Sequence, residues 1–294
     1  MQASKAVPGF LPVLGLLFSA TLWGISWYPL RLLEQHGLEG LWAIIASYSA
    51  AMLAGLWLLW RYRGEIARAP GFVLALALSS GWCNAAFIMA VLDGTVVRVM
   101  LLFYLSPIWT VLLGWLLLGE AMSRRSLAIF SIAMTGAVIM LWDPETGSLL
   151  PSGHTDWLAL SSGLAFAVSN VLVRRLRQTS LFLKAASNWA GVLGIAILWV
   201  WFADLPRPEV VSHLWWSAAA LGLAGFALAT LSLQYGVTQM PVHRSAVILL
   251  FQLVVGALSS LALASERIEP REWLGGLFVI MAALLSSRIR EHEP

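Results

Sequence analysis

Ten long apolar runs, separated by short polar breaks, constrain this chain more than any other feature. Each run holds about 17–25 residues, the length that a helix needs to cross the hydrocarbon core of a bilayer. The runs lie at 11–31, 39–60, 71–92, 96–118, 126–142, 156–174, 181–202, 214–236, 243–264 and 272–288. Because only helices and closed barrels satisfy every backbone group in lipid, this pattern predicts an all-α integral membrane protein with ten transmembrane helices.

Composition narrows the class further. The chain is 60% hydrophobic and 11% charged, whereas a soluble domain carries roughly 25% charged residues. A net charge of +3 is too small to favour nucleic acid as a partner. The single cysteine, Cys83, excludes an intramolecular disulfide. With no Cys/His cluster for a metal and no G-x-x-x-x-G-K-[ST] loop for ATP, we expect neither metal nor cofactor.

The basic residues predict the orientation. Ten spans place both termini on the same side of the membrane. Most Lys and Arg residues then fall in the segments on the side of the termini, and positively charged segments remain in the cytoplasm. We therefore expect both termini to be cytoplasmic.

An internal repeat divides the chain into two halves. The stretch Ser19–Ser26 overlays Ser162–Ser169, and Arg31 then coincides with Arg174. Further along, Leu116–Glu120 overlays Ala262–Glu266, and at the same offset Arg98 coincides with Arg244. Each half holds an odd number of spans, so the second half enters the membrane upside down. The sequence thus predicts two inverted five-helix repeats, residues 1–143 and 154–294, a pattern typical of transporters that alternate access around a central site.

Two stretches resemble the ten-helix branch of the drug/metabolite transporter superfamily, which is built from two EamA domains. They are Leu22–Ser26 in the first run and Leu105–Trp109, which continues to Leu116–Glu120. The resemblance spans about 11–288. The second half departs from the pattern at Leu253, which stands in place of Pro107, and at Ser265, which stands in place of Gly119. This departure weakens the expectation that both halves bend in the same way.

The resemblance implies a function. Proteins of this type are exporters in the bacterial inner membrane, and the likeness is greatest to exporters of neutral and aromatic amino acids. Other metabolites or drugs are the alternative substrates. The partners expected on this basis are a small-molecule substrate and the lipid bilayer, while the oligomeric state is left open.

Polar and aromatic residues inside the runs predict one central chamber, because lipid cannot satisfy polar groups. Its walls would be aromatic and neutral, which suits a small amphipathic solute better than a polyanion. The predicted set is Ser19, Trp23, Ser26, Trp27, Trp82, Asn84, Tyr104, Ser106, Phe166, Ser169, Asn170, Thr230 and Gln252. The alternative is that the serines pack between helices or bond their own backbone, and that Trp23 and Trp82 fill the core.

Charged residues at the ends of the runs have two readings. Arg98 and Arg244 either attract or gate a carboxylate or extend to the membrane interface, as Lys184 is expected to do. Glu120 and Glu266 are expected to cap helices or to bond across a loop. Pro107 predicts a helix bend, because proline removes an intrahelical hydrogen bond.

Two other classes of function remain to be weighed. No Asp or Glu lies in the middle of a run, and every His lies at an end or in a loop. An intramembrane enzyme would need such groups to activate a nucleophile, so we do not expect an enzyme. A proton-driven carrier usually keeps one as a relay, so facilitated diffusion or exchange is favoured. Only the inverted repeat argues against a receptor, channel or scaffold. The sequence therefore predicts a secondary transporter.

Overall fold

The computed structural model describes residues 10–38, 40–94, 96–141, 151, 153–263 and 269–288. Within these residues every regular element is helical. The first half contains α1 (Phe10–Ile25), α2 (Trp27–Gln35), α3 (Gly40–Arg61), α4 (Arg63–Arg68), α5 (Pro70–Asp93), α6 (Val96–Phe103), α7 (Ser106–Leu113), the π-helical η1 (Gly114–Leu118) and α8 (Arg124–Leu141). The second half contains α9 (His154–Arg175), α10 (Leu181–Phe202), α11 (Ser212–Leu221), the π-helical η3 (Gly222–Phe226), α12 (Ala227–Gln239), α13 (Val242–Leu249), α14 (Phe251–Leu263) and α15 (Pro270–Ser287).

Among the described residues, nine helical stretches are long and apolar enough to cross a membrane. Several consist of consecutive elements, such as α1 with α2 (Phe10–Gln35) and α11 with η3 and α12 (Ser212–Gln239). The tenth predicted run, 272–288, coincides with α15, which is not among those nine. The prediction of an all-α, multi-span membrane protein is confirmed, and every predicted run coincides with a helix.

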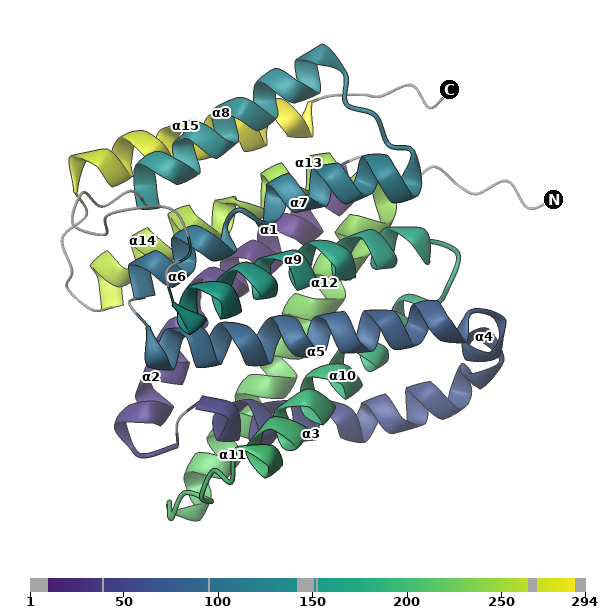
Figure 1. Cartoon of the computed structure of the whole chain (residues 1–294), viewed down its shortest axis with the longest axis vertical. Coiled ribbons are helices and arrows are strands. Elements are labelled where there is room, and N and C mark those ends of the chain that lie inside the picture. Colours follow the sequence, from purple (N-terminus) through teal and green to yellow (C-terminus); the bar gives the residue numbers. More distant parts are fainter. Residues whose placement is uncertain are drawn as a thin grey trace.

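The helices lie side by side between two ends of the molecule (Figure 1). We call one the α4 end, because α4 lies there, and the other the α2 end. In Figure 1, α1 begins and α15 ends at the α4 end. The pair α8 and α15 forms one outer edge, and α3, α10 and α11 lie toward the opposite edge.

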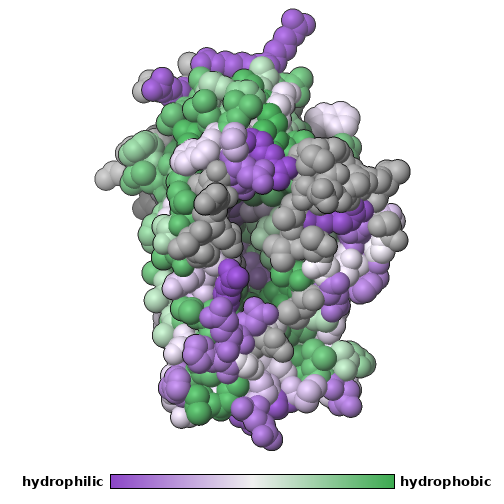
Figure 2. Space-filling model, turned by 90° about the vertical axis from the view of Figure 1, so that its left-hand side faces the viewer, coloured by the Kyte–Doolittle hydropathy of each residue, from purple (hydrophilic) through white to green (hydrophobic). Residues whose placement is uncertain are grey.

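The outer surface is apolar where lipid would contact it. Leu53 and Phe202 are each 77% exposed and Trp216 is 73% exposed. Exposed side chains of this kind are costly in water and favourable in hydrocarbon. Viewed onto the α2 end, Figure 2 shows hydrophilic residues gathered over this face and a hollow near its centre.

The first span of each half packs against helices of the other half. The first span, through α1, packs on α12 and α14 of the second half. In the same way α9, the first helix of the second half, packs on α5, α6 and α7 of the first half. Apart from these contacts, α3 packs on α10 and α8 packs on α15. Each span therefore has neighbours from the other half.

A pair of hydrogen bonds repeats this relationship in atomic detail. Ser19 Oγ donates to the carbonyl oxygen of Ala229 at 2.9 Å. Ser162 Oγ donates to the carbonyl oxygen of Cys83 at 2.7 Å. The two donors are the serines that the sequence overlay aligned. The two acceptors are equivalent too, since Cys83 and Ala229 are separated by 146 residues, the same offset that relates Arg98 to Arg244.

The fourth and ninth spans are both broken near their middle. In the fourth span α6 ends at Phe103 and α7 begins at Ser106, just before Pro107. In the ninth span α13 ends at Leu249 and α14 begins at Phe251, although no proline follows. At each break a backbone bond tightens to i−3, from Leu105 to Leu102 and from Leu250 to Val247, both at 3.3 Å. Both spans are therefore interrupted at equivalent points, and in the ninth span the interruption forms without a proline.

Glycines allow the closest helix crossings. A Cβ on Gly191 of α10 would collide with the backbone of Ala77 in α5. At the α8–α15 crossing a Cβ on Gly136 would lie 2.6 Å from the carbonyl oxygen of Gly275. Close approach of this kind is how membrane helices gain packing energy without a hydrophobic driving force.

We expect Gly191→Ala to force α5 and α10 apart and to lower the free energy of unfolding by about 2 kcal/mol. Thermal unfolding of the detergent-solubilised protein measures this change. Gly194→Ala is the matched control, because a Cβ there meets nothing within 4 Å. Alanine also favours the helix, so the control should be neutral or slightly stabilising. Equal melting temperatures for the two variants would contradict the packing argument.

Candidate functional site

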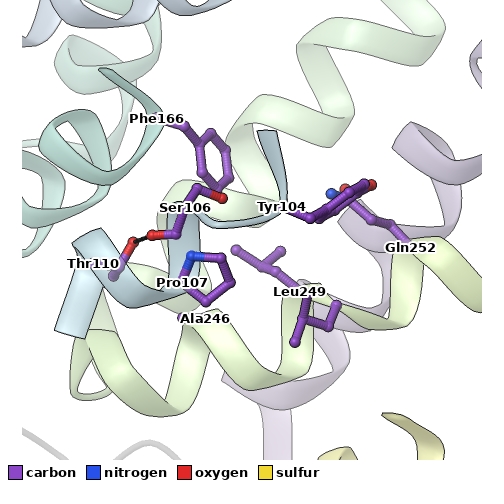
Figure 3. A pocket seen from close by; sticks show the side chains of 9 residues that line it. Tyr104, Ser106, Pro107, Thr110, Phe166, Ala246, Leu249 and Gln252 are labelled. Atoms are coloured by element: carbon purple, nitrogen blue, oxygen red, sulfur yellow. Dashed lines mark hydrogen bonds between the residues drawn. The ribbon is translucent and has the colours of Figure 1, made fainter. Parts of the chain in front are cut away.

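A small cavity lies where the fourth and ninth spans break (Figure 3). The empty space in and around it, including open solvent at its mouth, is about 240 Å³. The lining residues come from α7, α9, α13 and α14 and from the two breaks themselves. They are Tyr104, Ser106, Pro107, Thr110, Phe166, Ala246, Leu249, Leu250 and Gln252. The cavity therefore lies between the two halves, at equivalent points of each.

The helix breaks explain why polar groups face this space. Thr110 Oγ1 donates to the Ser106 carbonyl at 2.9 Å, within the first turn of α7. Figure 3 shows the Ser106 hydroxyl pointing toward the Phe166 ring and the Gln252 amide beside Tyr104. The walls thus offer two aromatic rings, hydroxyl groups and one amide, and all of the lining residues are uncharged. This arrangement provides hydrogen bonds and apolar contact without a fixed charge.

Four residues of the predicted chamber meet in this cavity, namely Tyr104, Ser106, Phe166 and Gln252, together with Pro107. The other predicted residues lie elsewhere. Ser26 and Ser169 bond carbonyls of their own helices, at 2.7 Å to Trp23 and 2.9 Å to Phe166. Along with Ser19, these serines have the packing contacts that the alternative reading described.

The tryptophans of the predicted set make ring contacts and hydrogen bonds between helices. Trp23 stacks on Phe226 with ring centroids 5.3 Å apart. Trp27 Nε1 donates to Ser259 Oγ at 2.9 Å, which joins the first span to α14. Trp82 is 39% exposed, and its ring lies 5.5 Å from that of Trp199. In this conformation Trp82 therefore faces outward rather than into the cavity.

Three predicted amide and hydroxyl residues are placed apart from the cavity. Asn84 Nδ2 donates to the Ser80 carbonyl at 3.0 Å. Thr230 and Asn170 are both buried. Within the described part of the chain, Asn170 Oδ1 has no hydrogen-bond partner. A buried carbonyl oxygen of this kind is costly unless another state of the protein or a solute satisfies it.

Arg98 and Arg244 lie at opposite ends of the bundle. Arg98 binds Asp156 through two hydrogen bonds of 2.8 and 2.7 Å, a pair that joins α6 to α9 at the α2 end. Arg244 Nη2 donates to the Ser287 carbonyl at 2.8 Å. To attract a solute carboxylate, Arg98 would have to loosen its bond to Asp156, so its gating role stays a prediction.

Glu120 links three spans at the α4 end. Its Oε1 accepts a hydrogen bond from Arg174 Nε at 2.8 Å, and its Oε2 accepts the N–H of Val242, the first residue of α13, at 2.8 Å. Arg174 Nη1 also donates to the Thr238 carbonyl at 2.7 Å. Glu120 therefore caps a helix and bonds across the chain, as the sequence suggested. Its repeat partner Glu266 lies outside the described residues.

Sequence reasoning missed Lys184. We expected its side chain to reach the membrane interface, and that expectation is wrong, because Lys184 is only 1% exposed. Its Nζ donates to Thr238 Oγ1 at 2.5 Å. The sequence does place Gln234 and Thr238 one helical turn apart, which indicates a polar face on their span. That this face meets Lys184 is seen only in the structure. For the described residues there is no group of His, Cys, Asp and Glu that could hold a metal ion.

We expect Asp156→Asn to lower the free energy of unfolding by about 1–3 kcal/mol, because it removes a bidentate carboxylate from a largely buried Arg98. Thermal unfolding in detergent measures the loss. Asp93→Asn is the matched control, since Asp93 is exposed and lies 3.6 Å from the exposed His154. Its effect should stay within about 0.5 kcal/mol. Equal losses in both variants would contradict a stabilising role for the Arg98 pair.

Comparison with known proteins agrees with this architecture. A solved crystal structure superposes with a TM-score of 0.70 at 18% identity, covering 94% of this chain and 96% of that one. An uncharacterized transporter of Pseudomonas aeruginosa is 28% identical over 206 residues, which are 67% of this chain and 65% of that protein. An uncharacterized transporter of Archaeoglobus fulgidus is 24% identical over 231 residues, 76% of this chain and 79% of that protein.

The family assignment rests on a match that covers nearly the whole chain. The model of the EamA-like transporter family matches twice, at residues 10–142 and 154–288. The two matched segments follow one another along the chain, and both relatives named above are described as uncharacterized transporters. The chain belongs to the EamA-like transporter family.

Proposed function

We propose that this protein is a secondary transporter for small amphipathic solutes, with neutral and aromatic amino acids as the leading substrates. One observation carries the proposal. The cavity at the matched breaks of the fourth and ninth spans combines the Tyr104 and Phe166 rings with the Ser106 hydroxyl and the Gln252 amide. An uncharged site with both apolar faces and hydrogen-bonding groups suits a solute that is polar at one end and apolar at the other.

The cavity must enlarge during transport. In this conformation it has room for about one water molecule, far less than the roughly 300 Å³ at which ligand pockets usually begin. At the α4 end, Glu120 joins Arg174 and Val242 across the spans, whereas the α2 end carries a hollow near its centre (Figure 2). We infer that this conformation is closed at the α4 end, and that solute is released there when the Glu120 contacts separate.

Alternating access follows from two inverted repeats. We propose that residues 1–143 and 154–294 are these repeats, and that they rock around the cavity. The equivalent hydrogen bonds of Ser19 and Ser162 and the equivalent breaks of the fourth and ninth spans support this division. We further propose a bacterial inner membrane location with both termini, and hence the α4 end, in the cytoplasm.

The driving force and affinity follow from the uncharged cavity. A site lined by no Asp, Glu or His favours facilitated diffusion or exchange. Release requires weak binding, so we expect affinities in the high micromolar to millimolar range, about −4 to −6 kcal/mol. Under these conditions the gradient sets the direction, and export is the direction that the resemblance to exporters implies.

Uptake of labelled Thr, Met, Phe, Trp and Glu into liposomes that contain the purified protein tests the proposal. We expect saturable uptake of the neutral and aromatic amino acids without a proton gradient. Uptake that requires the gradient would contradict the facilitative mechanism. Uptake no greater than in empty liposomes would contradict amino acids as substrates and direct the search to other metabolites and drugs.

We expect Gln252→Leu to reduce the initial rate of phenylalanine uptake about tenfold, because the cavity loses its amide while its size is nearly kept. Gln239→Leu is the matched control, since Gln239 lies exposed at the end of α12. Its rate should equal that of the wild-type protein. A Gln252→Leu variant that is folded and fully active would exclude this cavity as the solute site.

A further inference from the structure

Lys184 is a buried cation with an unusual environment. It lies in the first turns of α10 at the α4 end and is only 1% exposed. An ammonium group in a membrane protein is costly unless an anion or several acceptors compensate it. Within the described residues its hydrogen-bond partner is a hydroxyl, Thr238 Oγ1, and no ion pair forms.

The side chains next to Lys184 form a polar ladder on α12. Thr230, Gln234 and Thr238 follow one another at single-turn spacing, and all three are buried. Thr238 Oγ1 donates to the Gln234 carbonyl at 2.6 Å, and Gln234 Nε2 donates to the Lys184 carbonyl at 3.3 Å. In the described part of the chain, Gln234 Oε1 has no hydrogen-bond partner. The cluster that holds the Lys184 ammonium thus also contains a buried acceptor without a partner among the described residues.

Among the described residues no carboxylate pairs with Lys184, and the nearby Glu120 is already bound to Arg174. Arg174 reaches the carbonyl of Thr238, but its own charge is matched by Glu120 at 2.8 Å. The first half has no counterpart of this cluster, because Ile88 and Leu92 stand at the repeat equivalents of Gln234 and Thr238. The cluster therefore belongs to one end of the protein only, the α4 end.

We propose that Lys184, with Gln234 and Thr238, forms a subsite for the carboxylate of the transported solute. This proposal rests on the proposed function and specifies which chemical group of the solute is recognised as it passes the α4 end. The Lys184 ammonium has three donor positions, of which Thr238 uses one, so two remain for a carboxylate. The Gln234 oxygen accepts a hydrogen bond from the ammonium group of the same amino acid.

The subsite becomes accessible when the α4 end opens. Thr238 is fixed through its carbonyl to Arg174, and Arg174 is fixed to Glu120. Separation of Glu120 from Arg174 releases the end of α12 and exposes the Lys184 cluster. The ladder leads from Thr230 in the interior to Thr238 at this end, so the carboxylate has polar groups along its path.

The test uses phenylacetate and phenylacetamide, which have nearly the same shape but differ in charge. Binding to the purified full-length protein is followed by the shift in melting temperature as each compound is titrated. We expect phenylacetate, but not phenylacetamide, to stabilise the wild-type protein. Lys184→Gln should weaken phenylacetate binding about tenfold. Lys184→Arg should keep most of the binding, because it keeps the charge.

Arg125→Gln is the matched control, since it removes one exposed positive charge at the same end of the bundle. It should bind phenylacetate as the wild-type protein does. The proposal is overturned if phenylacetate stabilises neither protein, or stabilises Lys184→Gln as strongly as the wild type. If Lys184→Gln does not fold, Gln234→Leu replaces it. That variant should lose affinity for phenylalanine, because the ammonium group of phenylalanine bonds to the Gln234 oxygen. It should keep its affinity for phenylacetate, which has no ammonium group. Equal changes in affinity for the two compounds would overturn the proposal.

Transport separates this proposal from the proposed function. If the wild-type protein binds phenylacetate through Lys184 but liposomes that contain it take up no amino acid, the carboxylate subsite is supported and amino-acid transport is contradicted. Phenylalanine uptake with a half-saturation concentration unchanged in Lys184→Gln would leave transport in place and exclude the carboxylate subsite.

Discussion

Lipid cannot hydrogen-bond to a polar group, and the rest of this structure depends on that constraint. Each span is helical because a helix satisfies its own backbone. The serines inside the spans then find carbonyl acceptors, as Ser19 does at Ala229 and Ser162 does at Cys83. Charged residues obey the same rule, since Arg98 meets Asp156 and Arg174 meets Glu120 at opposite ends. Polar groups that remain incompletely satisfied are therefore informative, and Gln234 Oε1, in the cluster of Lys184, is one of them among the described residues.

The breaks in the fourth and ninth spans connect this constraint to function. A broken helix releases backbone and side-chain polar groups inside the membrane, which is tolerated only where protein or a cavity surrounds them. Both breaks border the same cavity, and its walls come from both halves. A rocking motion of one half against the other would therefore change the shape of this cavity directly. Glycine crossings such as Gly191 on Ala77 keep the surrounding helices close enough to move as packed units.

The two ends of the protein differ more than the repeat alone implies. Arg98 and Asp156 join α6 to α9 at the α2 end, while Glu120, Arg174 and Val242 join three spans at the α4 end. The polar ladder on α12 leads to Lys184 at the α4 end only. Inverted repeats supply two equivalent conformations, and differences in the contacts at each end determine which is more stable.

The sequence by itself determined the helical class, the positions of the spans, the equivalence of Ser19 with Ser162 and the family, because membrane span length and repeat spacing are local properties of the chain. Tyr104, Ser106, Phe166 and Gln252, four residues of the predicted chamber, line one cavity, and their role as a solute site stays a prediction. Only the tertiary structure decided that Trp82 faces outward, that the ninth span breaks without proline, and that Lys184 is buried. Those features depend on which helices meet at which angle, and on partners such as Thr238 that lie far away in sequence. A short sequence pattern does not specify which residues of distant spans come into contact, so these features are known only from the packed structure.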